Sequence, residues 1–60
     1  MILALIDKKG YKEFIEIVWL KEDNERIHIE FADGKTLRFI INDYEHISLE
    51  TNGESYNLKK

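Results

Sequence analysis

The stretch that decides the fold is residues 27–39, IHIEFADGKTLRF. Apolar and polar residues alternate on both sides of a central turn sequence, as in two strands joined by a tight turn. A three-residue loop over 32–34, with its glycine in the left-handed bulge position, pairs Ile29 with Leu37 and Ile27 with Phe39. A two-residue loop would instead oppose apolar to charged side chains, because a one-residue slip turns every side chain to the other face. The sequence therefore predicts a hairpin in the bulged register.

A second hairpin is predicted around Asn52-Gly53, the dipeptide most typical of a two-residue type I′ turn. This turn pairs Leu49 with Tyr56 and Ile47 with Leu58, apolar opposite apolar. The consistency of the two hairpins favours an antiparallel sheet.

A third turn is expected in the acidic stretch before residue 27. A five-residue loop over 21–25 pairs Trp19 with Ile27, which continues the same apolar face. Together the three registers predict one face that contains Ile15, Ile17, Trp19, Ile27, Ile29, Phe31, Leu37, Phe39, Ile47, Leu49, Tyr56 and Leu58.

Residues 11–21 leave an alternative open. Tyr11, Phe14, Ile15, Val18 and Trp19 recur at helical spacing, which would make the fold α+β. The same segment is rich in β-branched and aromatic residues, which favour strands, and it lacks a strong N-cap. We therefore expect a strand there and keep a helix at about 11–21 as the alternative.

A polar break at residues 41–46 separates two apolar runs, and Asn42 or Asp43 could cap a single helical turn there. A 3₁₀ turn before the last strands resembles the layout of small SH3-like barrels. This resemblance concerns architecture only and implies no activity. The predicted fold class is all-β, a small antiparallel meander or SH3-like barrel of five to six strands.

The length and composition of the chain limit the number of domains and the classes of partner. Sixty residues fit one domain, 1–60, which is near the lower limit for folding without disulfides, metals or oligomerisation. The chain has no Cys, a net charge of −3 and no long apolar run. These features argue against nucleic acid and membrane partners, and we expect a cytoplasmic protein.

The sequence contains no motif typical of catalysis, metal binding or phosphate binding. His28 and His46 are the two histidines, and without Cys they are too few to form a typical zinc site. Ser48 and Ser55 lie in no nucleophile motif, and the glycines are isolated, so no phosphate loop is present. We expect no enzyme, no cofactor and no metal.

A second apolar set motivates the functional hypothesis. In the strand interpretation Phe14, Val18, Leu20 and Ile40 face away from the main apolar face, and residues 2–6 are apolar on both faces. These side chains either close a second core or form an exposed patch, and exposed patches mark interaction sites. The expected function is a non-catalytic protein-interaction module, self-associating as a homodimer or acting as an inhibitor or adaptor of a larger complex.

The alternative function is a small barrel that binds nucleic acid or a small ligand. It requires a basic face that is not visible in the linear sequence. The residues that would build it are Lys8, Lys9, Lys12, Arg38, Lys59 and Lys60.

Overall fold

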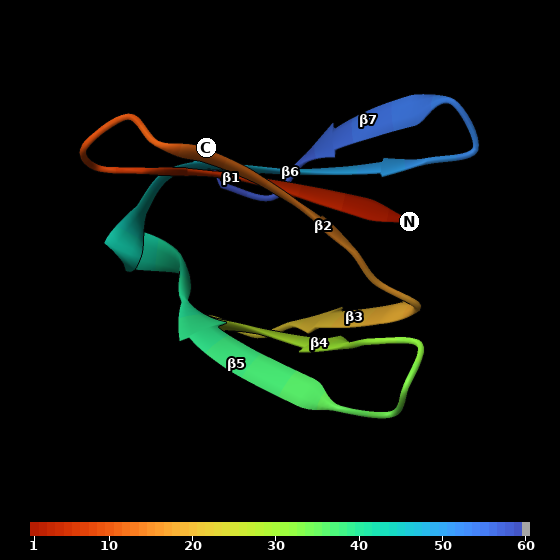
Figure 1. Cartoon of the computed structure of the whole chain (residues 1–60). Helices are drawn as coiled ribbons and strands as arrows, with labels where there is room; N and C mark the ends of the chain where they lie inside the picture. The colour runs from red at the N-terminus through yellow and green to blue at the C-terminus, as the bar shows by residue number, and fades with distance from the viewer. Residues whose placement is uncertain (60) are drawn as a thin grey trace.

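The computed structural model describes residues 1–59, which form a small all-β domain of two antiparallel sheets (Figure 1). The first sheet has the strand order β2-β1-β6-β7, with β1 at Ile2–Asp7, β2 at Lys12–Glu16, β6 at Tyr44–Thr51 and β7 at Glu54–Asn57. The second sheet has the order β3-β4-β5, with β3 at Trp19–Glu22, β4 at Arg26–Glu30 and β5 at Thr36–Ile40. The 3₁₀ turn η1, Ile41–Asp43, links β5 to β6. The predicted all-β class is confirmed.

Residues 1–59 contain seven strands instead of five or six, because the segment expected as one strand is bent. The backbone N–H of Ile17 donates to the Met1 carbonyl oxygen at 2.9 Å, in line with the β1–β2 ladder. The next N–H, of Val18, donates to the Glu30 carbonyl oxygen at 2.9 Å, beside β4. The chain therefore passes from one sheet to the other at residues 17–18. The alternative helix at 11–21 is wrong, because this segment forms β2 and the start of β3.

The hairpins that turn at Gly34 and at Asn52-Gly53 have the predicted registers. Across β4 and β5, Ile27 lies opposite Phe39 and Ile29 opposite Leu37. Across β6 and β7, Leu49 lies opposite Tyr56. Beyond β7, the Leu58 N–H donates to the Ile47 carbonyl oxygen at 2.8 Å, which continues that register.

The predicted register between β3 and β4 is wrong. Trp19 lies opposite Glu30, and Leu20 lies opposite Ile29. The loop has two residues instead of five, and it is closed by the Asp23 N–H, which donates to the Arg26 carbonyl oxygen at 3.0 Å. This three-residue shift reverses the faces, because side chains alternate along a strand. Leu20 therefore points toward the core and Trp19 away from it.

The core lies between the two sheets. It consists of fully buried aliphatic side chains from both sheets and from the bend, namely Leu3, Leu5, Ile17, Ile27, Ile29 and Ile47. Half-buried side chains surround it: Ile15, Leu20, Phe31, Phe39, Ile41, Tyr44, Leu49 and Leu58. Phe39 of β5 and Tyr44 of β6 meet edge to face, with ring centroids 5.2 Å apart. Three members of the predicted apolar face, Trp19, Leu37 and Tyr56, are instead exposed.

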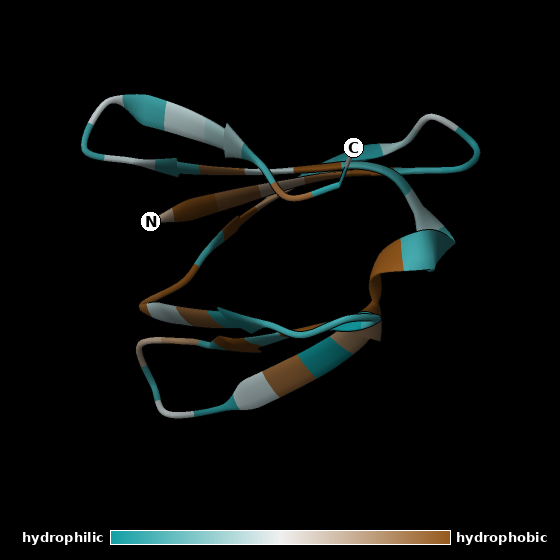
Figure 2. Cartoon of the chain, turned by 180° about the vertical axis from the view of Figure 1, so that it is seen from behind, coloured by the Kyte–Doolittle hydropathy of each residue, from teal (hydrophilic) through white to brown (hydrophobic). Residues whose placement is uncertain are grey.

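The strands differ in how they bury their apolar residues. Figure 2 shows that β1 is hydrophobic along most of its length, whereas β5 alternates between hydrophobic and hydrophilic residues. Both faces of β1 are thus apolar, although only one of them faces the second sheet. The alternation in β5 leaves polar side chains on the outer face of the second sheet.

Candidate functional site

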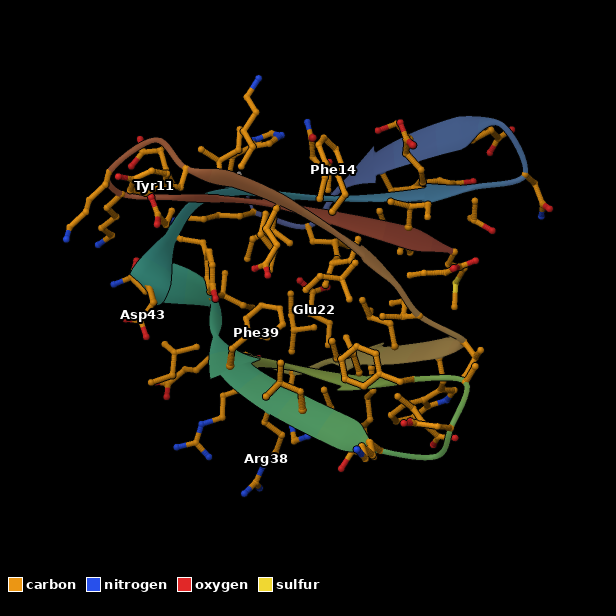
Figure 3. The ribbon with its side chains drawn as sticks, in the orientation of Figure 1. Tyr11, Phe14, Glu22, Arg38, Phe39 and Asp43 are labelled. Atoms are coloured by element: carbon orange, nitrogen blue, oxygen red, sulfur yellow. The ribbon has the colours of Figure 1, made fainter. Side chains whose placement is uncertain are left out.

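The outer face of the second sheet carries a row of basic side chains. Residues directly opposite one another in antiparallel strands share a face, and Lys21 of β3 lies opposite His28 of β4, which lies opposite Arg38 of β5. We call these three residues the basic row. Strands are about 4.8 Å apart, so the row spans about 10 Å. In Figure 3 the Arg38 side chain points away from the first sheet, whereas Phe39 lies between the sheets.

The basic row carries two exposed cations on one face of the sheet. Lys21 and Arg38 lie on either side of His28, two strands apart. Within residues 1–59, neither Lys21 nor Arg38 forms an ion pair. The row also stands out in a chain whose net charge is −3. Unpaired cations on one exposed face can contact an anionic partner, which makes the row the candidate site.

A shallow hollow of about 770 Å³ lies over this row, and Trp19 forms part of its lining. Trp19 is 47% exposed, so its indole ring offers a large apolar surface beside the cations. The other lining residues are Lys21, Asp23, His28, Ile29, Thr36, Leu37 and Arg38. The hollow thus combines an aromatic surface, cations and polar groups, which suits an anionic group attached to apolar structure.

Asp23 ties the basic row to the turn between β3 and β4. Its Oδ1 accepts the N–H of Arg26 at 2.9 Å and of Glu25 at 3.1 Å, and its Oδ2 lies 3.3 Å from Nε2 of His28. The two backbone donors, foremost Arg26, lower the pKa of the Asp23 carboxyl, and His28 adds a smaller effect in the same direction. Asp23 is therefore an anion that holds the central residue of the row in place.

A second hollow, of about 420 Å³, opens beside Tyr44 near η1. Asp7, Glu13 and Asp43 are among its lining residues. Burial raises the pKa of the Tyr44 hydroxyl, and the three carboxylates raise it further. Within the described part of the chain, no group of three or more His, Cys, Asp or Glu side chains could hold a metal ion. This hollow therefore offers neither a cation cluster nor a metal centre.

The partner-binding residues expected from the sequence do not form one patch. Leu20 packs against the core, whereas Phe14, Val18 and Ile40 are exposed. Phe14 lies on the first sheet and Ile40 on the second, and Figure 3 shows Phe14 on the side of the molecule opposite Arg38. Their role in partner binding stays a prediction for the exposed residues.

The lysines and arginine of the alternative basic face are also separated. Lys8, Lys9 and Lys12 belong to the hairpin between β1 and β2, whereas Arg38 lies on the second sheet. Nζ of Lys59 donates to the Tyr44 carbonyl oxygen, and Lys60 lies outside the described residues. Of this set, only Arg38 belongs to the basic row.

Sequence reasoning missed the basic row because it placed Lys21 in a loop and Trp19 in the core. One signal was available: the confirmed register of β4 and β5 sets His28 opposite Arg38. The third member depends on the register between β3 and β4, which the acidic turn sequence did not reveal.

The described residues include no helix that is long and apolar enough to cross a membrane. Comparisons with protein-family models, curated proteins and solved structures give no match to this chain.

Proposed function

We propose that this chain is a non-catalytic protein-interaction module that binds an acidic polypeptide segment on the outer face of β3-β4-β5. The observation that supports this most is the basic row, Lys21, His28 and Arg38, beneath a hollow with the exposed Trp19 in its lining. Charged side chains at exposed sites steer partners of opposite charge, and Trp and Arg are enriched among residues that dominate binding energy.

The extent of the row favours a short acidic segment over nucleic acid. Three strands span about 10 Å, which matches one or two carboxylate side chains and not a long run of phosphates. Glu30 lies in the next row of the same face, and Asp23 lies at its edge. These carboxylates would repel a polyanion that extends beyond the row.

Trp19 provides the assay, since it is the only tryptophan in the chain. Its fluorescence is followed while a glutamate-rich peptide, a lysine-rich peptide or a short oligothymidylate is added at low salt. We expect saturable binding of the acidic peptide alone, weakened by salt because the contacts are exposed and electrostatic.

Variants then locate the binding site. Lys21→Glu and Arg38→Glu are each expected to weaken binding of the acidic peptide about tenfold or more, equivalent to about 1.4 kcal/mol. Lys8→Glu changes the net charge equally but lies in the turn after β1, and it should leave binding unchanged. Tighter binding of the oligonucleotide, or equal losses in all three variants, would contradict the proposal.

A further inference from the structure

The outer edge of β2 has backbone groups free to pair with another strand. β2 ends the strand order of the first sheet. The Asp7 N–H donates to the Tyr11 carbonyl oxygen, and the Ile17 N–H donates to the Met1 carbonyl oxygen, so odd-numbered residues bond toward β1. Because backbone direction alternates along an antiparallel strand, the N–H and C=O groups of residues 12, 14 and 16 point to the free edge. Exposed edges of this kind are templates for strand addition.

The side chains along this edge complement a second copy of themselves. An antiparallel pairing centred on Phe14 sets Phe14 opposite Phe14, and Lys12 of each copy opposite Glu16 of the other. All three residues are exposed, and Phe14 is 70% exposed. Aromatic pairs and opposite charges at directly opposed positions each stabilise a pair of strands. The residues with free backbone groups are thus the same residues whose side chains match.

The other free edges lack this self-complementarity. On β5, the pair formed by the Phe31 N–H and the Lys35 carbonyl oxygen directs residues 36, 38 and 40 outward, so symmetric pairing sets Arg38 against Arg38. On β7, the outward residues are Ser55 and Asn57, which offer neither charge nor apolar surface. On β3, the outward residues are Leu20 and Glu22, a half-buried apolar residue and an acid.

We propose that the chain forms a symmetric homodimer in which the β2 edges of two copies pair antiparallel about Phe14. The two first sheets then form one continuous sheet with the order β7-β6-β1-β2-β2-β1-β6-β7. The pairing is isologous, because each copy uses the same surface, and it closes at two copies. It leaves the basic row on the second sheet free, so it does not depend on the proposed function.

The solution mass tests the dimer. Sedimentation equilibrium across a range of concentrations should give twice the 7.2 kDa of one chain at high concentration. Hydrogen exchange measured by NMR should show the amides of residues 12, 14 and 16 protected in the dimer and unprotected on dilution. A wild-type chain that stays monomeric, or one that assembles beyond two copies, would overturn the proposal.

A charge exchange locates the interface. Lys12→Glu alone and Glu16→Lys alone each oppose like charges, and each should weaken dimerisation at least tenfold. The double variant Lys12→Glu/Glu16→Lys restores both pairs and should recover the dimer, which a general effect on folding would not do. Phe14→Glu should give a folded monomer, and Lys8→Glu should remain dimeric. A dimer that survives both Phe14→Glu and Lys12→Glu would rule out this edge.

Discussion

The outer faces of the two sheets cover the same core and differ in chemistry. On the first sheet β1, one of two central strands, presents Ile2, Ala4 and Ile6 outward, half buried, with Phe14 beside Ala4. The other central strand, β6, presents polar residues on the same face. On the second sheet the outward positions of the central strand β4 are Arg26, His28 and Glu30, all polar. In Figure 2, β1 is hydrophobic along most of its length, whereas β5 alternates between hydrophobic and hydrophilic residues.

This contrast shows that the inner faces determine the fold and the outer faces determine what can bind. Each sheet contributes aliphatic side chains to one core, and the described residues include no buried polar or charged side chain. The outward positions are under no such packing constraint. The outer face of the first sheet therefore has an apolar strip along β1 next to a self-complementary edge, with polar residues on β6 beyond it. The outer face of the second sheet is cationic.

The largest expected change in the free energy of unfolding comes from a residue on the inner face of the second sheet, compared with one on its outer face. Ile27 is fully buried, and its replacement in Ile27→Ala should lower the free energy of unfolding by about 2–5 kcal/mol. Ile40→Ala removes the same atoms from a side chain that is 43% exposed, and should cost about 1 kcal/mol or less. Urea denaturation of both variants measures the difference. Equal losses would contradict the assignment of the two faces.

A smaller effect tests the corrected register between β3 and β4. Leu20→Ala should lower the free energy of unfolding by about 2 kcal/mol, because Leu20 packs against the core. Trp19→Ala should lower it by about 1 kcal/mol or less and should abolish peptide binding on the outer face. The register expected from the sequence predicts the reverse order of stability, so thermal denaturation of the two variants distinguishes them.

The registers that could be predicted from the sequence are those with a strong local signal. The turns at 32–34 and at Asn52-Gly53 each contain a glycine, and Gly34 has a φ of 90° as the bulged loop requires. The turn after β3 has no glycine. It is set by the Asp23 carboxylate, which accepts two backbone N–H groups, and the sequence does not distinguish this role from an ordinary acidic loop.

The bend at residues 17–18 has no local signal either, since neither glycine nor proline marks it. The chain bends there because Ile17 must enter the core while the next residues pair with β4, which is a property of the whole fold. The basic row depends on this bend and on the register that follows it. The candidate site was therefore less predictable than the fold class.

Each sheet has one hairpin turn with a glycine at the same positive φ, so the two sheets can be compared by the same substitution. Gly10, between β1 and β2, and Gly34, between β4 and β5, both have a φ of 90°, and nothing lies within 4 Å of an added Cβ at either. Gly10→Val and Gly34→Val should each lower the free energy of unfolding by about 1–2 kcal/mol through backbone strain alone. Gly34→Asn should cost less, because Asn tolerates positive φ. An unchanged melting temperature in Gly34→Val would contradict the bulged turn.

The smallest expected effect concerns pH and is confined to the second sheet. The Arg26 and Glu25 N–H groups lower the pKa of the Asp23 carboxyl, so the folded state favours its charged form. A carboxyl whose pKa is lower in the folded state adds stability above its unfolded pKa of about 3.9, and this stability is lost as the pH falls through the folded pKa.

The variant Asp23→Asn keeps the oxygen acceptor and removes the charge. Its melting temperature should therefore fall below that of the wild type at pH 6 and converge with it near pH 2. Asp23→Ala, which also removes the acceptor, should lie below Asp23→Asn by a similar amount at every pH. If the wild type and Asp23→Asn differ equally at pH 6 and pH 2, the charge of Asp23 does not stabilise the turn.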